Sequence, residues 1–316
     1  MSNNTYAIIG SGALGGFYGA KLQKAGLEVH FLLHSDYHHV LENGFIIKSK
    51  DGDFKLSQVN AYNNTNEMPK CDVILIGLKT TQNNLLAKFL PPLLKENTVV
   101  LLLQNGLSAE PEVAKIVGEQ RLIGGISHLA SNKLSFGYIH HIDDGSIRIG
   151  RYARNYQFAK ITNKMREITH DFEISGVPVY LTEDLLLERW KKLVWNIPYN
   201  SLSVILDART NEIMGNANTI NLVVEIMQEV LEGAKSCQRQ IPDTYIQKML
   251  DHTKKLQPYL TSMKIDYERR RPLEIEGIIG NPLRMAREAG IKLPKMGMLY
   301  QQLKFLDTRN IQNFSS

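Results

Sequence analysis

The chain has 316 residues, of which 43% are hydrophobic and 22% charged, and its formal net charge is +5. This length is enough for two domains, and the mild, scattered positive charge favours a small anionic ligand over nucleic acid. Two cysteines, Cys71 and Cys237, are too few for a disulfide framework and show no metal-ligand spacing. No signal-peptide pattern opens the chain and no apolar run has the length of a membrane span, so we expect a cytoplasmic protein with no metal and no membrane partner.

An apolar run at 6–9 leads directly into a glycine-rich turn. The turn has the pattern G-x-G-x-x-G and consists of Gly10, Ser11, Gly12, Ala13, Leu14 and Gly15. In a dinucleotide-binding βαβ unit the first glycine allows a tight turn, the second lets the backbone approach a pyrophosphate, and the third lets the helix pack on the strand. A helix over 13–25 and a second strand over 29–33 are expected to follow. The pattern therefore predicts dinucleotide binding, and the alternative is a glycine turn with a structural role only.

Strands and helices alternate through the first half of the chain. Continuous apolar runs at 72–77 and 98–103 are typical of parallel strands that are buried on both faces. A hairpin centred on Asp51-Gly52 is expected over 45–59, and further short strands over 122–126, 138–142, 146–149 and 177–180. Beyond 183 only helical patterns remain. We expect an α/β fold with a Rossmann-type, doubly wound, mostly parallel sheet over 1–182, followed by an all-helical domain over 183–316.

A polar stripe marks the start of the helical half. Lys192, Asn196 and Asn200 stand at i, i+4 and i+8, so they share one face of a helix whose other residues are mainly apolar. An amine and two carboxamides in such a setting suit a substrate-facing row. The alternative is a solvated helix face, and Pro198 can also kink the helix and disturb the alignment.

Several motifs occur in the order seen in the ketopantoate reductase (2-dehydropantoate 2-reductase) family, which the chain resembles over nearly its whole length. They are the glycine turn at 10–16, Leu78-Lys79-Thr80, Gln104-Asn105-Gly106, Trp190-Lys191-Lys192 with Asn196 and Asn200, and Thr261-Ser262-Met263 followed by Glu274. The resemblance implies an NADPH-dependent oxidoreductase that acts on the CH-OH group of its donor and reduces ketopantoate to pantoate, on the route to pantothenate and coenzyme A. Family members are often dimeric, so the resemblance leaves a homodimer open.

The resemblance also implies roles for individual residues. Lys192 corresponds to the catalytic lysine that gives a proton to the substrate carbonyl, a role that suits an ammonium group. Asn196, Asn200 and Ser262 would bind the small anionic 2-oxo acid. Lys79, Asn105 and Ala130 would join the glycine turn in binding NADP(H). Glu274 would reach the cofactor and complete the catalytic site, whereas without the resemblance we would expect an exposed helix carboxylate.

The chain departs from the family at the end of the second strand, where His34 replaces the usual arginine. That arginine grips the 2′-phosphate of NADPH, whereas NAD enzymes place an acidic residue there to bind the ribose hydroxyls. We expect His34 to bind the phosphate and the cofactor to be NADP(H). Asp36 would favour NAD if its carboxylate reached the ribose. A reductase of another 2-oxo or hydroxy acid and a non-catalytic dinucleotide-binding protein remain as alternatives.

Overall fold

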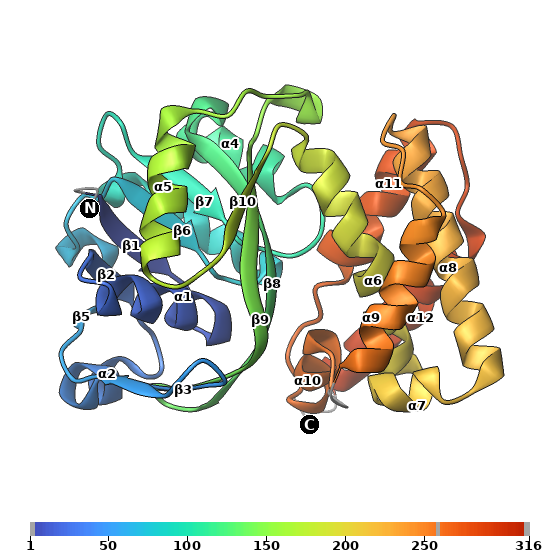
Figure 1. Ribbon diagram of the computed structural model, residues 1–316, viewed down its shortest axis with the longest axis horizontal. Helices are drawn as coiled ribbons and strands as arrows, with labels where there is room; N and C mark the ends of the chain where they lie inside the picture. Colours follow the sequence, from blue (N-terminus) through green and yellow to red (C-terminus); the bar gives the residue numbers. More distant parts are fainter. Residues whose placement is uncertain (1–3, 257–259, 313–316) are drawn as a thin grey trace. The chain divides into compact units, whose positions relative to one another are not determined.

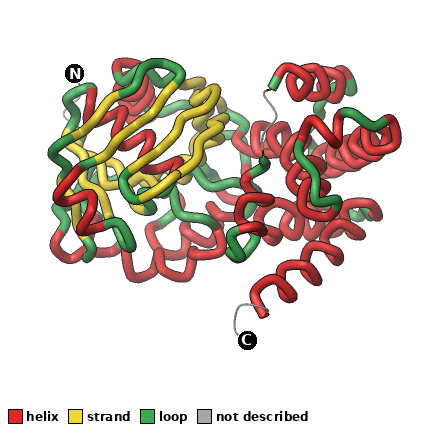
Figure 2. The backbone as a smooth tube through the Cα atoms, turned by 90° about the horizontal axis from the view of Figure 1, so that it is seen from below, coloured by secondary structure: helices red, strands yellow, loops and turns green. Residues whose placement is uncertain are grey.

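The chain forms two compact units in the computed structural model, which describes residues 4–256 and 260–312 (Figure 1). The first unit comprises Met1–Gln104 and Ala109–Leu185, and the second comprises Asn105–Ser108 and Leu186–Ser316. Figure 2 shows that the strands gather in the first unit and that the second is built from helices. The predicted fold class, a mostly parallel sheet followed by a helical part, is confirmed.

A ten-stranded sheet forms the centre of the first unit. The strands are β1 (Thr5–Ile9), β2 (Glu28–Leu32), β3 (Phe45–Ser49), β4 (Phe54–Leu56), β5 (Asn60–Tyr62), β6 (Val73–Ile76), β7 (Val99–Leu102), β8 (Leu122–Ser135), β9 (Tyr138–Arg151) and β10 (Val179–Thr182). Their order is β4-β3-β9-β8-β7-β6-β1-β2-β5, and β10 pairs with β9. The pairs β3–β4 and β8–β9 are antiparallel, and the remaining pairs are parallel. The hairpin predicted around Asp51-Gly52 is therefore present as β3–β4.

The prediction of separate short strands after 122 is wrong in one respect. The segments expected at 138–142 and 146–149 belong to a single strand, β9, which pairs along its length with the equally long β8. Asp144 and Gly145 lie between these segments, and their positive φ angles of 54° and 121° are typical of a turn. Here they lie in a strand that contains bulges, because the β8–β9 register shifts at three places and absorbs the irregular backbone.

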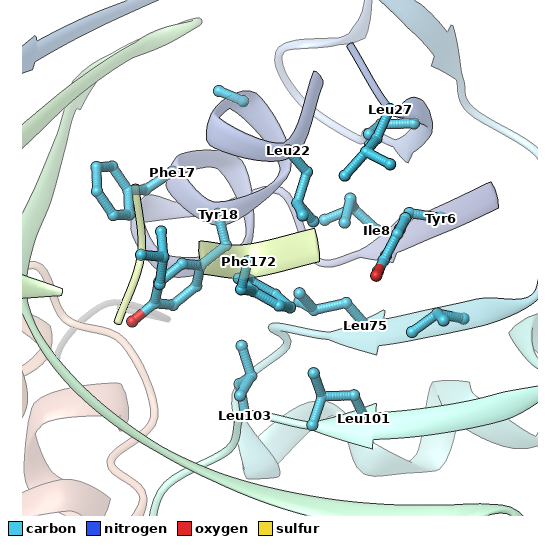
Figure 3. Close-up of a cluster of buried hydrophobic side chains, with 14 of the residues drawn as sticks. Tyr6, Ile8, Phe17, Tyr18, Leu22, Leu27, Leu75, Leu101, Leu103 and Phe172 are labelled. Carbon is cyan, nitrogen blue, oxygen red and sulfur yellow. The ribbon is translucent and has the colours of Figure 1, made fainter. Parts of the chain in front are cut away.

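Helices α1 (Ala13–Lys24) and α5 (Asn163–Ile174) provide side chains to the main core of the sheet domain. Figure 3 shows Phe17, Tyr18 and Leu22 of α1 and Phe172 of α5 gathered with Tyr6 and Ile8 of β1, Leu75 of β6, and Leu101 of β7. Alternate residues of β1 point to this core, and those between them, Ala7 and Ile9, are also fully buried. The central strands are thus covered on both faces, as their continuous apolar runs predict.

The remaining helices complete both units. In the first unit they are α2 (Tyr37–Asn43), α3 (Leu86–Phe89) and α4 (Ala109–Val117); from the boundary onward they are α6 (Leu185–Ile205), α7 (Thr210–Met214), α8 (Ala217–Ser236), α9 (Thr244–Lys255), α10 (Ser262–Glu268), α11 (Asn281–Glu288) and α12 (Pro294–Gln312). A π-helix, η6 (Glu276–Gly280), precedes α11. Among residues 4–256 and 260–312, no helix combines the length and apolar character that crossing a bilayer requires.

Helix α6 is held in the helical unit by close packing and by polar contacts between its neighbours. Trp190 of α6 is fully buried, and a Cβ at Gly233 of α8 would lie 2.8 Å from its ring, so the two helices approach closely. Glu229, also on α8, accepts hydrogen bonds from the backbone amides of Lys295 and Met296 and so caps the start of α12. These contacts give α6 a fixed frame in which to present its polar stripe.

Candidate active site

The glycine-rich turn lies between β1 and α1, and its backbone leaves no room for side chains at two of the three glycines. Gly10 has a φ of +94°, and a Cβ there would lie 2.4 Å from the backbone nitrogen of Leu78. A Cβ at Gly15 would lie 2.3 Å from the Gly10 carbonyl oxygen. A Cβ at Gly12, by contrast, would meet no described atom within 4 Å. The backbone at Gly12 is therefore open where α1 begins, which fits the predicted approach of a pyrophosphate.

Hydrogen bonds join this turn to the ends of the neighbouring strands. Ser11 donates through Oγ to the backbone oxygen of Leu32 at 3.0 Å, which ties the turn to the end of β2. Gln104, just after β7, donates through Nε2 to the backbone oxygen of Leu78 at 2.9 Å. Lys79 is the next residue and is half-buried. The first unit thus brings the glycine turn, the end of β2 and Lys79 to the carboxyl edge of the parallel strands, where such sheets bind nucleotides.

The two residues that bear on the choice between NADP and NAD have different surroundings. His34 is exposed. Asp36 is 3% exposed, and its Oδ2 lies 2.5 Å from Nζ of Lys133 on β8. The sequence interpretation missed Lys133, because it lies 97 positions after Asp36 and no local pattern signals their contact.

Ala130 lies in the β8–β9 hairpin. It is half-buried and is paired with Asp143 of β9, next to one of the register shifts. On the same strand, Ser127 shares a 2.7 Å hydrogen bond between its Oγ and the hydroxyl of Tyr18 on α1, so β8 passes along α1. His128, which follows Ser127, is exposed. The role of Ala130 in cofactor binding stays a prediction.

The polar stripe of the helical unit lies on α6, and its two asparagines are buried. Asn196 is 6% exposed and Asn200 is 2% exposed, whereas Lys192 is half-buried. Oδ1 of Asn200 accepts a long hydrogen bond of 3.4 Å from the backbone amide of Met263, next to Ser262 at the start of α10. The stripe is therefore not a solvated helix face, and the structure brings Asn200 close to the segment that carries Ser262. Ser262 itself is exposed.

The carboxamide of Asn196 makes no hydrogen bond to any residue in the described ranges, 4–256 and 260–312. Neither of its polar atoms is among the fully enclosed, unpaired side-chain atoms of these ranges, so both keep some access to the surface. A carboxamide that keeps such access and lacks a protein partner is well suited to bind the oxygen atoms of a ligand.

Helix α6 continues through Pro198. Proline has no backbone N–H to donate, so the helix loses one of its hydrogen bonds at this point. Ser201 donates through Oγ to the backbone oxygen of Ile197 at 2.6 Å, and Ser203 shares a 2.7 Å hydrogen bond between its Oγ and Oγ1 of Thr261. Thr261 also caps α10 by accepting from the backbone amide of Lys264. These contacts fix the end of α6 against the start of α10, on either side of Asn200 and Ser262.

Glu274 is buried, with 6% of its surface exposed, so the expectation of an exposed helix carboxylate is wrong. The π-helix η6 begins two residues later, and such irregular helical turns are frequent at functional sites. The loop that carries Asn105 contacts this π-helix: the amide of Leu107 donates to the backbone oxygen of Gly277 at 2.8 Å. Nδ2 of Asn281 donates to the backbone oxygen of Leu107 at 2.7 Å. The structure thus brings Asn105 and Glu274 into one unit, joined through η6.

These features define a class of protein. It is a nucleotide-binding protein of the Rossmann type with a second unit whose helices present a lysine and the amides of two buried asparagines. Comparison with known proteins makes the class specific. Residues 6–154 match the family model described as ketopantoate reductase PanE/ApbA, and residues 184–307 match that of its C-terminal part. The chain is 58% identical to a 2-dehydropantoate 2-reductase of Nostoc sp. over 98% of this chain and 97% of the relative. The chain therefore belongs to the ketopantoate reductase family.

Solved structures share the fold along nearly the whole chain. A 2-dehydropantoate 2-reductase from Geobacter metallireducens superposes with a TM-score of 0.91 at 40% identity, covering 95% of this chain and 99% of that protein. A D-mandelate dehydrogenase in complex with NADH and anilino(oxo)acetate superposes with a TM-score of 0.85 at 19% identity, covering 97% and 99%. At that lower identity the likeness concerns the fold alone.

Proposed function

We propose that this chain is a 2-dehydropantoate 2-reductase, which reduces ketopantoate to pantoate with NADPH in the biosynthesis of pantothenate and coenzyme A. Family membership and the 58% identity to the Nostoc enzyme support the reaction. The observation that carries the substrate site is Asn196, a residue with 6% of its surface exposed whose carboxamide finds no partner among the described residues. In this proposal residues 1–182 bind the cofactor and residues 183–316 bind the substrate.

The first unit has the features that a dinucleotide requires. The glycine turn offers its open backbone at Gly12 and the amino terminus of α1. Every residue of α1 is described, and its first turn contains no acidic side chain. Backbone amides at a helix amino terminus attract phosphate oxygens, and a nearby carboxylate would weaken that attraction. Lys79, Asn105 and Ala130 complete the proposed set of cofactor-binding residues. When bound, the reduced nicotinamide supplies the hydride that reduces the substrate carbonyl.

The helical unit supplies the proton and holds the substrate. The ammonium group of Lys192 stabilises the negative charge that develops on the carbonyl oxygen and then transfers a proton to it. The carboxamides of Asn196 and Asn200 and the hydroxyl of Ser262 hydrogen-bond the oxygen atoms of the small anionic 2-oxo acid. Glu274 completes the site beside the Asn105 loop and reaches the cofactor. The buried setting of the asparagines and Glu274 strengthens these polar interactions, because little water competes for them.

A second candidate is a reductase of another 2-oxo or hydroxy acid that uses NADH. It is favoured by His34, which lacks the second phosphate contact that an arginine offers. Initial rates of NADPH and NADH oxidation with ketopantoate and a panel of branched and aromatic 2-oxo acids separate the two. NADPH-selective turnover of ketopantoate supports the first candidate. Faster turnover of another acid, or a preference for NADH, contradicts it, and cofactor binding without turnover would indicate a non-catalytic protein.

A homodimer is part of the proposal as well. It rests on the family resemblance, and a ketopantoate reductase from Staphylococcus aureus with the same fold is described as dimeric. Light scattering coupled to size-exclusion chromatography measures the mass directly. A mass near that of one 35.8 kDa chain at micromolar concentration would contradict the dimer.

A further inference from the structure

The ion pair between Asp36 and Lys133 is the feature of the sheet domain that the proposed catalytic residues leave unexplained. Oδ2 of Asp36 lies 2.5 Å from Nζ of Lys133, with the two side chains 5% and 25% exposed. A carboxylate that is so deeply buried is strongly destabilised unless a cation lies beside it. Lys133 therefore neutralises Asp36, and its side chain keeps 25% of its surface exposed.

This pair is placed at the strand end where a Rossmann-type sheet binds the adenosine ribose. Asp36 follows the end of β2 by four residues and precedes α2 directly. The hydrogen bond from Ser11 to Leu32, at 3.0 Å, shows that the end of β2 adjoins the glycine turn. A dinucleotide whose pyrophosphate lies on that turn extends its adenosine ribose toward the same strand end. The ribose 2′ position is thus expected close to the side chains that follow Leu32.

The charge at this position decides which cofactor is accepted. A carboxylate alone would bind the two ribose hydroxyls of NADH and repel the 2′-phosphate of NADPH. With Lys133 beside it, the negative charge of Asp36 is neutralised, and its carboxylate is already paired. The contact with Asp36 is an ion pair, and an ammonium group has three N–H donors with which it can bind a phosphate. The pair therefore presents a positive hydrogen-bond donor instead of a bare negative charge.

We propose that Lys133 is a cofactor-specificity residue, whose ammonium group, positioned by Asp36, binds the 2′-phosphate of NADPH. This inference rests on the proposed function, because it deepens the cofactor preference of the same site. Asp36 acts as a positioning residue that holds the lysine side chain at the end of β2. His34, exposed two residues before Asp36, adds a second donor to the same phosphate.

The test measures dissociation constants by titration calorimetry for two matched ligand pairs, NADPH with NADH and 2′,5′-ADP with 5′-AMP. In Lys133→Met we expect the dissociation constants of NADPH and 2′,5′-ADP to rise about tenfold or more, because a charge-assisted contact is lost. Those of NADH and 5′-AMP should change less than about twofold. Lys133→Arg should keep the preference for the phosphorylated ligands, and Asp36→Asn should not weaken the binding of NADH.

A matched control is Lys50→Met. Nζ of Lys50 lies 2.5 Å from Oδ1 of Asp143, so this variant removes an ion pair of the same length from the same sheet, away from β2. It should leave both ligand ratios unchanged. If Lys133→Met loses affinity for NADPH and NADH equally, or loses affinity for neither, the inference is overturned. Weaker NADH binding in Asp36→Asn also overturns it, because it would make Asp36 the ribose ligand.

The wild-type protein separates this inference from the proposed function. Suppose that Lys133→Met selectively loses affinity for NADPH and that the wild-type protein does not reduce ketopantoate. That result would support the inference and contradict ketopantoate as the substrate. Turnover of ketopantoate with NADPH by a Lys133→Met variant of unchanged affinity would contradict the inference and support the reaction. A wild-type protein that binds none of the four ligands would contradict both.

Discussion

Gly106 provides a sharp test of how the Asn105 loop is joined to the π-helix. Its φ is +88°, and a Cβ at this position would lie 2.1 Å from the backbone oxygen of Gly277 and 2.2 Å from its carbonyl carbon. Non-bonded carbon atoms need about 3.5 Å, so Gly106→Ala must move the loop and η6 apart by more than about 1 Å. Both neighbours are backbone atoms, and no side-chain rotation can relieve the contact.

The cost has two parts. Alanine in a left-handed backbone conformation destabilises the folded state by about 1–2 kcal/mol. The separation also strains or breaks the hydrogen bonds from Leu107 to Gly277 and from Asn281 to Leu107, which are 2.8 and 2.7 Å long and contribute about 1 kcal/mol each. We therefore expect Gly106→Ala to destabilise the protein by about 2–4 kcal/mol. A shift of the Asn105 loop should also slow ketopantoate reduction about tenfold or more.

Gly290→Ala is the matched control, because Gly290 has the same φ of +88° and a Cβ there would meet no described atom within 4 Å. This control measures the cost of alanine in a left-handed backbone conformation without the cost of a steric contact. Differential scanning fluorimetry should place the Tm of Gly106→Ala at least about 3 °C below that of Gly290→Ala, and steady-state rates should fall only in the former. Equal Tm values for the two variants would refute the reasoning, because the contact with Gly277 would then have no energetic consequence.

Four further predictions concern single side chains. Lys192→Ala should lower kcat at least about 100-fold while NADPH still binds, which stopped-flow rates and calorimetry measure; an unchanged kcat would remove Lys192 from the mechanism. His34→Arg should tighten NADPH binding about three- to tenfold over NADH, because a guanidinium makes bidentate phosphate contacts, and equal effects on the two cofactors would place the phosphate elsewhere. Asn196→Leu should raise the KM for the 2-oxo acid about tenfold or more without lowering the Tm, since it removes an amide that has no partner in the described ranges; a lower Tm with unchanged KM would contradict this. Burial raises the pKa of the Asp307 carboxyl, so the folded state prefers the protonated form, and stability is lost as the pH rises from the unfolded-state pKa through the folded-state pKa. Asp307→Asn should therefore raise the Tm at pH 7 and leave it nearly unchanged at pH 3, and the opposite pattern in thermal melts would contradict the shift.

The fold could be predicted from the sequence where local patterns carry the information. The glycine turn needs only the spacing of three glycines after an apolar strand, and the buried parallel strands are continuous apolar runs. The helical period aligned Lys192, Asn196 and Asn200 on what is indeed one helix, α6. In each case the residues that determine the structure are neighbours in the chain.

The features that escaped prediction depend on contacts between distant residues. Asp144 and Gly145 have turn-like composition, but pairing with β8 keeps them within one long strand. Likewise, a sequence pattern cannot show that Asp36 receives its counter-ion from Lys133, or that Gly106 contacts Gly277. Tertiary pairing overrides local preference at all three places.

The helical unit departs from the usual rules of stability at the positions that we assign to catalysis. Proline occupies the interior of α6, and a π-helix follows Glu274. Each feature is unfavourable for folding by itself, because it removes or alters the regular helical hydrogen bonds. Sequences that specify a stable fold tend to break such rules only where function requires it. The grouping of these departures on α6 and around η6 therefore supports the same site that family membership indicates, on grounds that are independent of the comparison.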